Sequence, residues 1–420
     1  MCVKVVWFSI IKLSDSNPRA SGTWISSMYQ HLSKVKDVDI IANFYFAPVD
    51  KIEIQENAIK EIAVPQDILR KNKESQLTHL IDIIISLNPN LLHVWGTENK
   101  WGELLLHNGL SGISKLLEIQ GLKFFLQKKE IFYGGLQETL IKKIIGVKEL
   151  IYPKSKLYSL RSTYEEDGKS EIEVIRQYKY INTQSEWVRT LLKILFPDKS
   201  YFKTGIILRD SFLMSPEWFK LHDSKGSGVI LTTTSGITYK GLHFLILSMR
   251  HVIRLYPNVT LRVAGISIKD RKYRNSAYVN YLLYLIKFYK LEQSIVFLGN
   301  LDEYELKAEM YGADVFICSS YSESYCLALA EALSIGVPSI APYTSALPEL
   351  ISDGNDGYYY PINDEYVCAD RILKLLTNKE LRLQFSMQSS IKMRQKIMPT
   401  KIAEDQAKTY KTIVGDFNKK

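Results

Sequence analysis

The chain is poor in cysteine and has no long apolar run. Its four cysteines (Cys2, Cys318, Cys326 and Cys368) show no C-x-x-C spacing and no neighbouring histidine. Their spacing therefore matches no zinc-binding motif and favours a reduced, cytoplasmic setting. No stretch of about 18 apolar residues occurs, so no helix that spans a bilayer is expected. The apolar start at 3–11 is bracketed by lysines and lacks a clear cleavage signal, which predicts a buried strand rather than a signal peptide.

Other scarcities narrow the class of protein further. Only 13 prolines and 22 glycines occur in 420 residues, which excludes a collagen-like chain, and no short-period repeat indicates a solenoid or propeller. The 46% hydrophobic and 24% charged residues are ordinary for a folded protein and exclude general disorder. At about 100 to 200 residues per domain, the length predicts two or three domains.

The charge balance points to anionic partners. Lysine and arginine number 54 against 45 aspartates and glutamates, which gives a formal charge of +9. Such an excess is compatible with phosphorylated small molecules, anionic lipid or nucleic acid. No known nucleic-acid-binding module is recognisable, so nucleic acid is not expected as a partner.

Short β-rich runs alternate with helical patterns, which is typical of α/β domains with parallel sheets covered by helices. The pattern restarts after a polar segment at 211–228. We therefore expect two doubly wound, Rossmann-like domains that face each other across a cleft. Their expected bounds are 1–205 and 228–395, with a linker at 206–227 and a C-terminal helix at 396–420. The expected strands are 3–11, 38–46, 91–96, 116–121, 229–234, 261–265, 295–299, 314–320 and 338–341.

The most informative segment is 314–341, where a strand, an acidic turn and a helix follow one another. Glu323 and Glu331 are eight residues apart, about two helical turns, which places them on one side of this unit. The free amides at the predicted helix start suit a phosphate group. From spacing alone, a capping Glu323 and a solvated Glu331 are equally compatible with the pattern.

This segment resembles the signature of retaining GT-B glycosyltransferases of glycosyltransferase family 4, in which two glutamates separated by seven residues follow a strand. The resemblance continues through "ASGTWI" (20–25), "LLHVWGTE" (91–98), "EIQGL" (118–122), "YKGLHFLI" (239–246) and "LPELISDGNDGYYYP" (347–361). It is similar in particular to bacterial members that build capsule, lipopolysaccharide or exopolysaccharide. It implies a GT-B fold whose C-terminal helix returns to the first domain.

The resemblance also implies roles for individual residues. Lys240 would meet the diphosphate of a nucleotide sugar, Glu331 the ribose hydroxyls and Glu323 the hydroxyls of the transferred hexose. The implied catalytic residues are Glu323, Lys240 and Gln120. The implied donor-binding residues are Gly22, Thr23, Thr234, Lys240, Glu323, Ser324, Tyr325, Cys326, Leu327 and Glu331. On the acceptor side the implied residues are His93, Glu98 and Gln120.

The implied reaction takes place on one face of the sugar, and the leaving phosphate helps to deprotonate the acceptor. The protein would then orient the substrates and stabilise the developing diphosphate charge, with no metal and no cofactor. The D-x-D sequence at 37–39 lies at the start of a predicted strand and is interpreted as structural.

Three positions depart from the family pattern. Thr234 stands where relatives often carry an arginine, Gln120 where many carry a histidine, and Cys326 where glycine is usual. A glutamine cannot take up a proton near neutral pH. The departures keep open a second hypothesis, a catalytically silent GT-B protein that binds nucleotide sugar or acts as a scaffold. A nicotinamide-dependent oxidoreductase is not expected, because no G-x-G-x-x-G follows the first strand.

The expected acceptor is a glycan or a polyprenyl-diphosphate-linked sugar. Lysines alternate with apolar residues between 121 and 156, which suits peripheral contact with the anionic cytoplasmic face of the inner membrane. A solvated basic helix face is an equally good interpretation. The lysines are Lys123, Lys128, Lys129, Lys142, Lys143, Lys148, Lys154 and Lys156.

Overall fold

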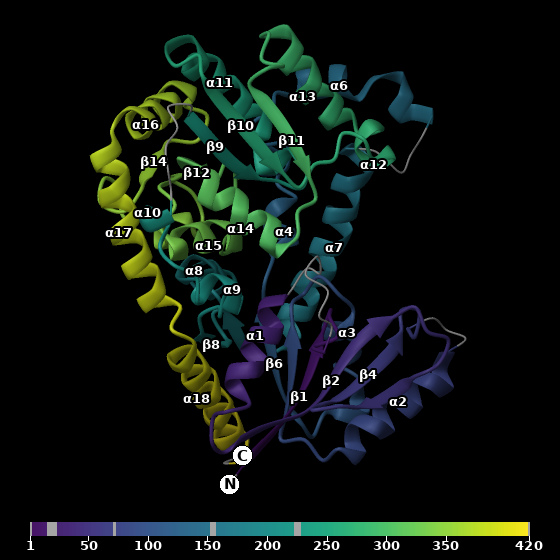
Figure 1. Ribbon diagram of the computed structural model, residues 1–420. Coiled ribbons are helices and arrows are strands. Elements are labelled where there is room, and N and C mark those ends of the chain that lie inside the picture. Colours follow the sequence, from purple (N-terminus) through teal and green to yellow (C-terminus); the bar gives the residue numbers. More distant parts are fainter. Residues whose placement is uncertain (1, 15–22, 70–72, 152–156, 222–227, 419–420) are drawn as a thin grey trace. The chain divides into compact units, whose positions relative to one another are not determined.

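The computed structural model describes residues 2–14, 23–69, 73–151, 157–221 and 228–418 (Figure 1). They form two compact units, and each unit combines segments that are distant in sequence. Unit 1 comprises Met1–Leu122, Lys169–Arg209 and Ile397–Lys420. Unit 2 comprises Lys123–Gly168 and Asp210–Lys396.

Unit 1 is built on an eight-stranded sheet with the order β3-β4-β2-β1-β5-β6-β7-β8. The pairings are parallel except for β3, which runs antiparallel to β4. The central strands are buried on both faces, and this explains why β1 is an almost continuous apolar run. The strands are β1 (Val3–Ser9), β2 (Val38–Ala47), β3 (Glu53–Glu56), β4 (Lys60–Pro65), β5 (Leu91–Trp95), β6 (Ser114–Ile119), β7 (Tyr180–Thr183) and β8 (Ser200–Lys203).

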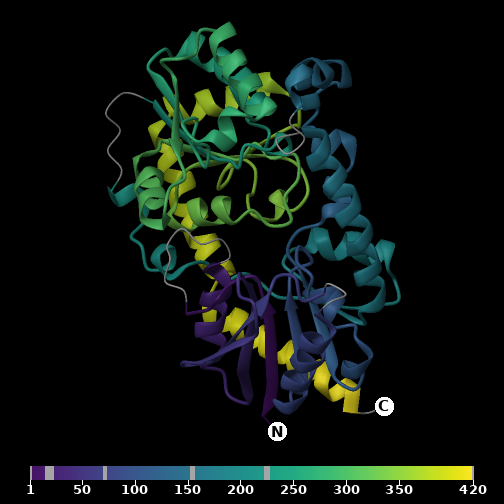
Figure 2. The ribbon, with the colours of Figure 1, turned by 90° about the vertical axis from the view of Figure 1, so that its right-hand side faces the viewer.

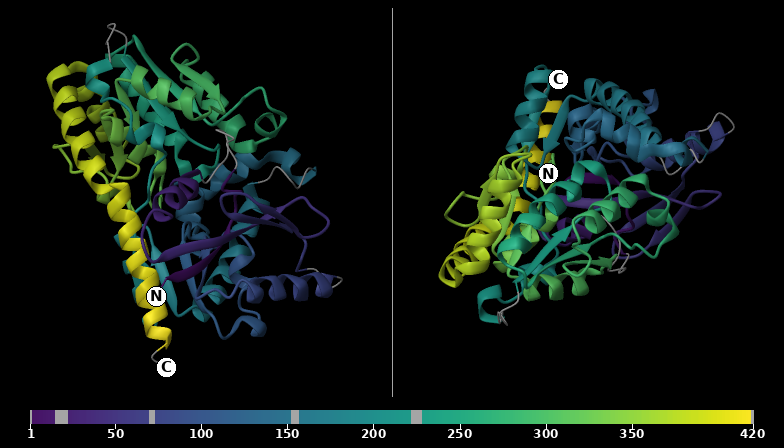
Figure 3. Two further views of the ribbon diagram at one scale, coloured as in Figure 1. Left: turned by 60° about the horizontal axis from the view of Figure 1, so that its bottom comes forward. Right: turned by 90° about the horizontal axis from the view of Figure 1, so that it is seen from above.

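The last helix of the chain belongs to unit 1. Helix α18 (Pro399–Asn418) lies beside α1 (Thr23–Leu32), β1 and β6, as the yellow helix in Figure 3 shows. This confirms the expected return of the C-terminal helix. The other helices of the unit are α2 (Glu74–Ser86), α3 (Trp101–Leu104), η2 (Asn108–Leu110), the second half of α7 (Leu157–Gln177) and α8 (Glu186–Leu195).

Unit 2 contains a parallel six-stranded sheet with the order β11-β10-β9-β12-β13-β14. In sequence order within the unit this is 3-2-1-4-5-6, the strand order of the Rossmann fold. The strand order therefore reverses between β9 and β12, although all six strands run parallel. The strands are β9 (Gly228–Thr233), β10 (Val259–Ala264), β11 (Ile295–Gly299), β12 (Val315–Ile317), β13 (Ser339–Pro342) and β14 (Tyr358–Tyr360).

Helices cover both faces of this sheet (Figure 2). The long helices of the unit are α6 (Glu138–Ile151), the first half of α7, α11 (Leu242–Leu255), α13 (Ala277–Phe288), α14 (Glu303–Gly312), α15 (Leu327–Ile335), α16 (Glu365–Thr377) and α17 (Lys379–Lys396). The short helices are α4 (Lys123–Leu126), α5 (Lys129–Phe132), α9 (Asp210–Leu213), α10 (Trp218–Leu221), η4 (Thr238–Lys240), α12 (Arg271–Arg274) and η5 (Leu347–Glu349). None of the helices in the described parts of the chain is long and apolar enough to cross a membrane.

The segment 123–168 packs with unit 2, whereas a continuous first domain over 1–205 was expected. His243 of α11 makes a 2.9 Å hydrogen bond from Nε2 to the carbonyl of Gly134, and the Thr238 hydroxyl donates to the carbonyl of Phe132. Helix α6 also lies against α13. These contacts join residues more than 100 positions apart, so local sequence patterns could not show them.

The expected linker at 206–227 also differs from the structure in its described part. Trp218 is 2% exposed, and its indole N–H donates to the carbonyl of Ala313 at 2.9 Å. Arg394 of α17 donates to the carbonyl of Ser215 at 2.6 Å. Residues 210–221 therefore pack as part of unit 2 rather than serving as a free connection, and 222–227 lie outside the described residues.

Candidate functional site

The candidate site lies in unit 2 at the carboxyl ends of β9 and β12. These two strands are neighbours in the sheet, and the strand order reverses between them. In open α/β sheets ligands bind at this switch point, because the two following loops diverge and leave their backbone groups accessible. The loop after β9 carries η4 with Lys240, and the segment after β12 carries Glu323 and leads into α15.

Lys240 and Glu323 form an ion pair at the switch point. The Lys240 ammonium donates to Glu323 Oε1 at 2.6 Å, and the two side chains are 24% and 14% exposed. Burial alone would lower the pKa of Lys240, but the charge of Glu323 and the hydrogen bond to it raise that pKa above its ordinary value. The lysine is therefore a permanent cation, next to a carboxylate that can accept hydrogen bonds.

The two loops are held together by their backbones. Gly241 has φ +68°, and an added Cβ would lie 2.0 Å from the carbonyl oxygen of Ser319. The Ser319 hydroxyl donates to the carbonyl of Lys240 at 2.7 Å, and the amide of Tyr321 donates to the carbonyl of Tyr239 at 2.7 Å. Glycine is required at 241 because any side chain there would push the lysine loop away from β12.

The first turn of α15 presents amides near Glu323. Cys326 occupies the N-cap position at φ +79°, and its side chain makes no capping hydrogen bond to the helix. The amides of the first turn lack partners within the helix, and they carry the positive end of its dipole. The usual glycine at this position in the resembling family fits this backbone, because a left-handed conformation costs other residues about 1–2 kcal/mol.

The second glutamate of the motif is buried. Glu331 is 5% exposed within α15, so it is not the solvated helix residue of the alternative interpretation. Tyr325 is also 5% exposed, while Ser324 and Leu327 are half-buried. The structure thus brings Lys240, Glu323 and the residues of this helix start together.

Thr234 lies at the end of β9 but adds no charge to the site. Its side chain is 7% exposed, and its backbone amide donates to the carbonyl of Ala264 at 2.9 Å. The hydroxyl accepts a long 3.4 Å contact from the amide of Gly236. Thr234 therefore supports the β9 loop, and it leaves Lys240 without the neighbouring arginine of the family pattern.

Two cysteines flank Glu323. Cys318 follows β12 directly, and its sulfur lies 3.9 Å from the sulfur of Cys326. The hydrogen bond between the two thiols lowers the pKa of Cys318 and raises that of Cys326 well above its ordinary value. Sequence reasoning missed Cys318 as a site residue, although its position at a predicted strand end was a usable signal.

His243 lies at the start of α11, next to the Lys240 loop, and its ring is neutral. Its Nδ1 accepts from the Tyr278 hydroxyl at 2.8 Å, and its Nε2 donates to Gly134. Burial lowers the pKa of His243 to about 4, because a charged imidazolium would lose its hydration, and the hydrogen bond to the Gly134 carbonyl offsets this only in part.

We expect this histidine to make unit 2 sensitive to acid. The unfolded chain binds the proton below about pH 6.5, while the folded chain binds it only near pH 4, so stability is full above pH 6.5 and falls as the pH drops. The expected loss is on the order of 3 kcal/mol across this range. Urea unfolding at pH 7 and pH 4.5 measures it. His243→Gln, which keeps a side-chain amide but does not titrate, should flatten this slope; an unchanged slope would contradict the assignment.

The three acceptor-side residues lie in unit 1 and divide into two groups. Glu98 is exposed, and its carboxylate lies over the backbone of Gly96 and Gly121, where an added Cβ would be 2.4 and 2.6 Å from its oxygens. The Gln120 side chain lies beside the same Gly96. The ends of β5 and β6 therefore bring Glu98 and Gln120 together.

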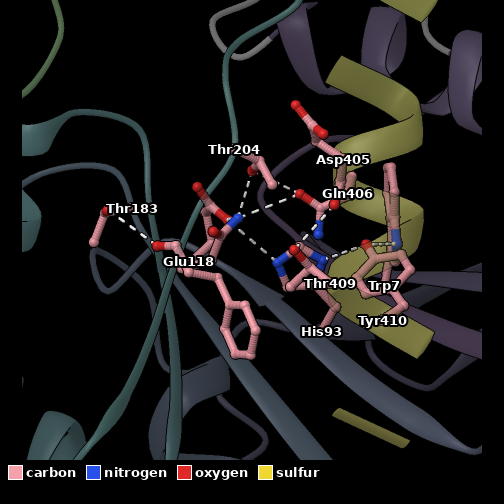
Figure 4. A network of polar contacts seen from close by, with 11 residues as sticks. Trp7, His93, Glu118, Thr183, Thr204, Asp405, Gln406, Thr409 and Tyr410 are labelled. Atoms are coloured by element: carbon pink, nitrogen blue, oxygen red, sulfur yellow. Dashed lines mark hydrogen bonds and ion pairs between the residues drawn. The ribbon is translucent and has the colours of Figure 1, made fainter. Parts of the chain in front are cut away.

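His93 does not join them. It is fully buried within β5, its Nδ1 lies 2.6 Å from the Tyr410 hydroxyl, and its Nε2 lies 3.5 Å from Glu118 (Figure 4). Burial lowers the pKa of His93 despite the nearby carboxylate of Glu118. A fully buried ring cannot line an acceptor surface, so the expected position of His93 is wrong and its role is to join β5 to α18.

The other residues named from the sequence are Gly22, Thr23 and the two aspartates of the D-x-D sequence at 37–39. Gly22 lies outside the described residues, and Thr23 begins α1 but its side chain is not described. In the D-x-D sequence both aspartates are exposed on unit 1, and Lys411 of α18 lies 3.3 Å from Asp37. This placement is in keeping with a structural interpretation of that sequence.

Comparison with known proteins adds a family match in unit 2. Residues 215–390 match the family described as Glycosyl transferases group 1. The putative colanic acid biosynthesis glycosyltransferase WcaL of Salmonella typhimurium is 32% identical over 139 residues, 32% of each chain. N-acetyl-alpha-D-glucosaminyl L-malate synthase of Bacillus anthracis is 28% identical over 135 residues, 32% of this chain and 35% of that protein. The chain thus spans about a third of the length of the curated relatives it matches.

Solved structures extend the similarity to the whole fold. Sucrose-phosphate synthase from Thermosynechococcus elongatus superimposes with a TM-score of 0.69 at 15% identity, covering 99% of this chain and 100% of that chain. Anabaena Alr3699/HepE, solved in complex with UDP-glucose, gives 0.66 at 12% identity, with 97% and 99% covered. At these identities the similarity establishes the fold alone, and the expected GT-B fold with two Rossmann-like α/β domains is confirmed.

Proposed function

We propose that this chain is a retaining glycosyltransferase that transfers a hexose-type sugar from a UDP- or GDP-sugar to a glycan or polyprenyl-diphosphate-linked acceptor. The single observation that carries the proposal is the Lys240–Glu323 pair at the switch point of unit 2, beside the start of α15. The family match covers this segment, and the similarity to a colanic acid glycosyltransferase supports a role in capsule, lipopolysaccharide or exopolysaccharide assembly.

The proposed donor site offers a cation and backbone amides for the diphosphate of a nucleotide sugar, and carboxylates that accept hydrogen bonds from its hydroxyl groups. Lys240 and the amides of 324–327 bind the diphosphate, and at about 4 Å the lysine contributes on the order of 4 kcal/mol per charge pair before desolvation is subtracted. Glu331 accepts from the ribose hydroxyls. Glu323 accepts from hydroxyls of the transferred sugar, and its ion pair with Lys240 fixes the carboxylate before the donor binds.

In the proposed reaction the acceptor attacks on the face from which the nucleotide leaves. The leaving phosphate takes up the acceptor proton, so Glu323 acts as a positioning group and Lys240 stabilises the negative charge that develops on the diphosphate. Gln120 binds the acceptor or the donor sugar through its amide. We propose that this reaction needs no metal ion and no cofactor.

The alternative is a catalytically silent protein that binds nucleotide sugar. It is favoured by one observation: Thr234 supplies no second cation for the diphosphate. Nucleotide release from a panel of UDP- and GDP-sugars, with and without lipid-linked acceptors, separates the two proposals. Release that depends on the acceptor supports the enzyme. Tight binding of a donor with no release on any acceptor would overturn it in favour of the silent protein.

We also propose peripheral contact with an anionic membrane through the exposed lysines of the 123–168 segment. Of the apolar residues between them, Phe124, Phe132 and Ile141 are buried in unit 2 and cannot reach a lipid surface. The exposed lysines would therefore carry the contact, at about 1 kcal/mol each near the surface. The described exposed lysines are Lys128, Lys129, Lys142 and Lys143, and the side chains of Lys148, Lys154 and Lys156 are not described.

Co-sedimentation with vesicles that contain phosphatidylglycerol tests this contact. We expect binding at low salt that is lost at about 0.5 M salt, where the Debye length falls to a few ångströms. Replacing the four exposed lysines with glutamine should abolish binding. Failure of the wild-type protein to sediment with these vesicles would refute the contact.

A further inference from the structure

The cysteine pair in unit 2 has the geometry of a ligand set for a soft metal ion. Cys318 is buried at the end of β12, and Cys326 is half-buried at the start of α15. One oxygen of Glu323 and the two sulfurs all lie within 4.8 Å of one another. The three ligand atoms come from one short segment, whose backbone is held by β12 and α15.

The distance between the sulfurs fits a shared metal ion. Two thiolates bound tetrahedrally to one zinc ion at about 2.3 Å are about 3.8 Å apart. The observed separation is 3.9 Å, so the pair needs almost no rearrangement to hold such an ion. Carboxylate oxygens bind zinc at about 2.0–2.2 Å, which a small rotation of Glu323 toward the sulfurs can supply.

The local charge also suits a divalent cation. Two thiolates and one carboxylate carry three negative charges, and the ammonium of Lys240, 2.6 Å from Glu323, offsets one of them. The two charges that remain match one Zn²⁺ or Cd²⁺ ion. Thiolate ligands select soft or borderline cations over Mg²⁺ and Ca²⁺, which prefer oxygen.

We propose that Cys318, Cys326 and Glu323 form a binding site for one thiophilic divalent cation of the Zn²⁺ class. Binding forms two metal–sulfur bonds and one metal–oxygen bond, and the two thiol protons pass to solvent. Three protein ligands leave one coordination position open.

The cation would inhibit the enzyme rather than assist it. Glu323 cannot bind the metal and accept hydrogen bonds from the sugar hydroxyls at the same time. A cation and a nucleotide sugar therefore exclude each other. This exclusion rests on the proposed function, whereas metal binding itself does not.

Titration of the full-length, reduced protein with Cd²⁺ tests the site, because cadmium thiolates absorb in the near ultraviolet. We expect one Cd²⁺ per chain with a thiolate band, and loss of that band in Cys318→Ser and in Cys326→Gly. The glycine variant guards against a trivial failure to fold, since position 326 has φ +79° and glycine adopts this conformation without strain. Cys2→Ser removes an exposed thiol elsewhere and should leave the band unchanged.

Absence of the band in the wild type, or a band of full size in folded Cys326→Gly, would overturn the proposal. A second titration in the presence of a UDP- or GDP-hexose tests the exclusion. At about ten times its own dissociation constant, a competing nucleotide sugar should raise the apparent Kd for Cd²⁺ about tenfold. Cadmium binding that no nucleotide sugar affects would leave the metal site standing and refute the donor site proposed around Glu323.

Discussion

Replacing Glu323 with glutamine is expected to lower the rate of sugar transfer on the order of 100-fold, the usual effect of removing one preorganised polar group from a reaction centre. The substitution keeps the size of the side chain and a carbonyl acceptor. It removes the charge that fixes the Lys240 ammonium 2.6 Å away. Nucleotide release under saturating donor and acceptor measures the effect, and transfer at the wild-type rate would contradict the role of Glu323.

A double-mutant cycle with Lys240→Met separates catalysis from stability. Removing the lysine alone leaves the largely buried Glu323 carboxylate without its cation, so both activity and the free energy of unfolding should fall. Adding Glu323→Gln should restore much of the stability and none of the activity. If the double variant regained transfer, the pair would be structural only.

An ion pair of similar burial in the same unit provides the matched control. Arg262 of β10 forms two hydrogen bonds of 2.5 and 2.6 Å with Glu309 of α14. Glu309→Gln removes a charge from such a pair without touching the switch point. Its transfer rate should stay within about twofold of the wild type, because neither Arg262 nor Glu309 belongs to the proposed donor site.

The fold was largely readable from the sequence because its central strands are apolar. All nine expected strands occur, since strands buried on both faces must be runs of Val, Ile, Leu and Phe. The strands β3, β4, β7, β8 and β14 were not expected. β3 is exposed along its whole length, β7 holds the polar Asn182 and Thr183, and β8 is an edge strand of four residues. Their pairing depends on neighbours, so local propensity carried too little signal.

Membership of the 123–168 segment in unit 2 could not be predicted for a different reason. Its hydrophobic pattern is that of any amphipathic segment and does not show which surface it covers. Specific hydrogen bonds determine which unit the segment packs against, such as those between Gly134 and His243 and between Phe132 and Thr238. Only the three-dimensional structure brings these residues together.

Some site residues could likewise be predicted from the sequence, and others could not. Glu323 was predicted from its place between a strand and a helix, and Lys240 from the family resemblance. Their segments follow β9 and β12, and these neighbouring strands deliver both residues to the same edge of the sheet. His93 was misplaced because it lies in the middle of β5, and strand periodicity does not show whether a polar side chain faces a ligand or a buried partner. Its partners, Glu118 and Tyr410, are 25 and 317 residues away.

The buried polar network around Asn182 gives the largest expected effect on stability. This side chain is fully buried, and its amide nitrogen donates to Glu118 at 2.7 Å, to Thr204 at 2.6 Å and to Gln406 of α18 at 3.2 Å. Asn182→Asp replaces that donor with a second carboxylate of the same shape. We expect a loss of about 3–5 kcal/mol in the free energy of unfolding at pH 7, because two buried carboxylates would face each other without a cation.

The pH dependence of this loss identifies its cause. A carboxyl pair that shares one proton has a raised pKa in the folded state, so the penalty is full above that pKa and shrinks as the pH falls toward about 4, the range of unfolded carboxyls. Urea unfolding of the variant and the wild type, compared at pH 7.5 and pH 5.5, should therefore show a smaller difference at the lower pH. Asn182→Ala, which removes the donor and adds no charge, should cost about 2–3 kcal/mol relative to the wild type at both pH values. An equal penalty for Asn182→Asp at the two pH values would mean that the introduced carboxyl does not face Glu118 in the buried interior. The network around Asn182 would then not hold α18 on the sheet.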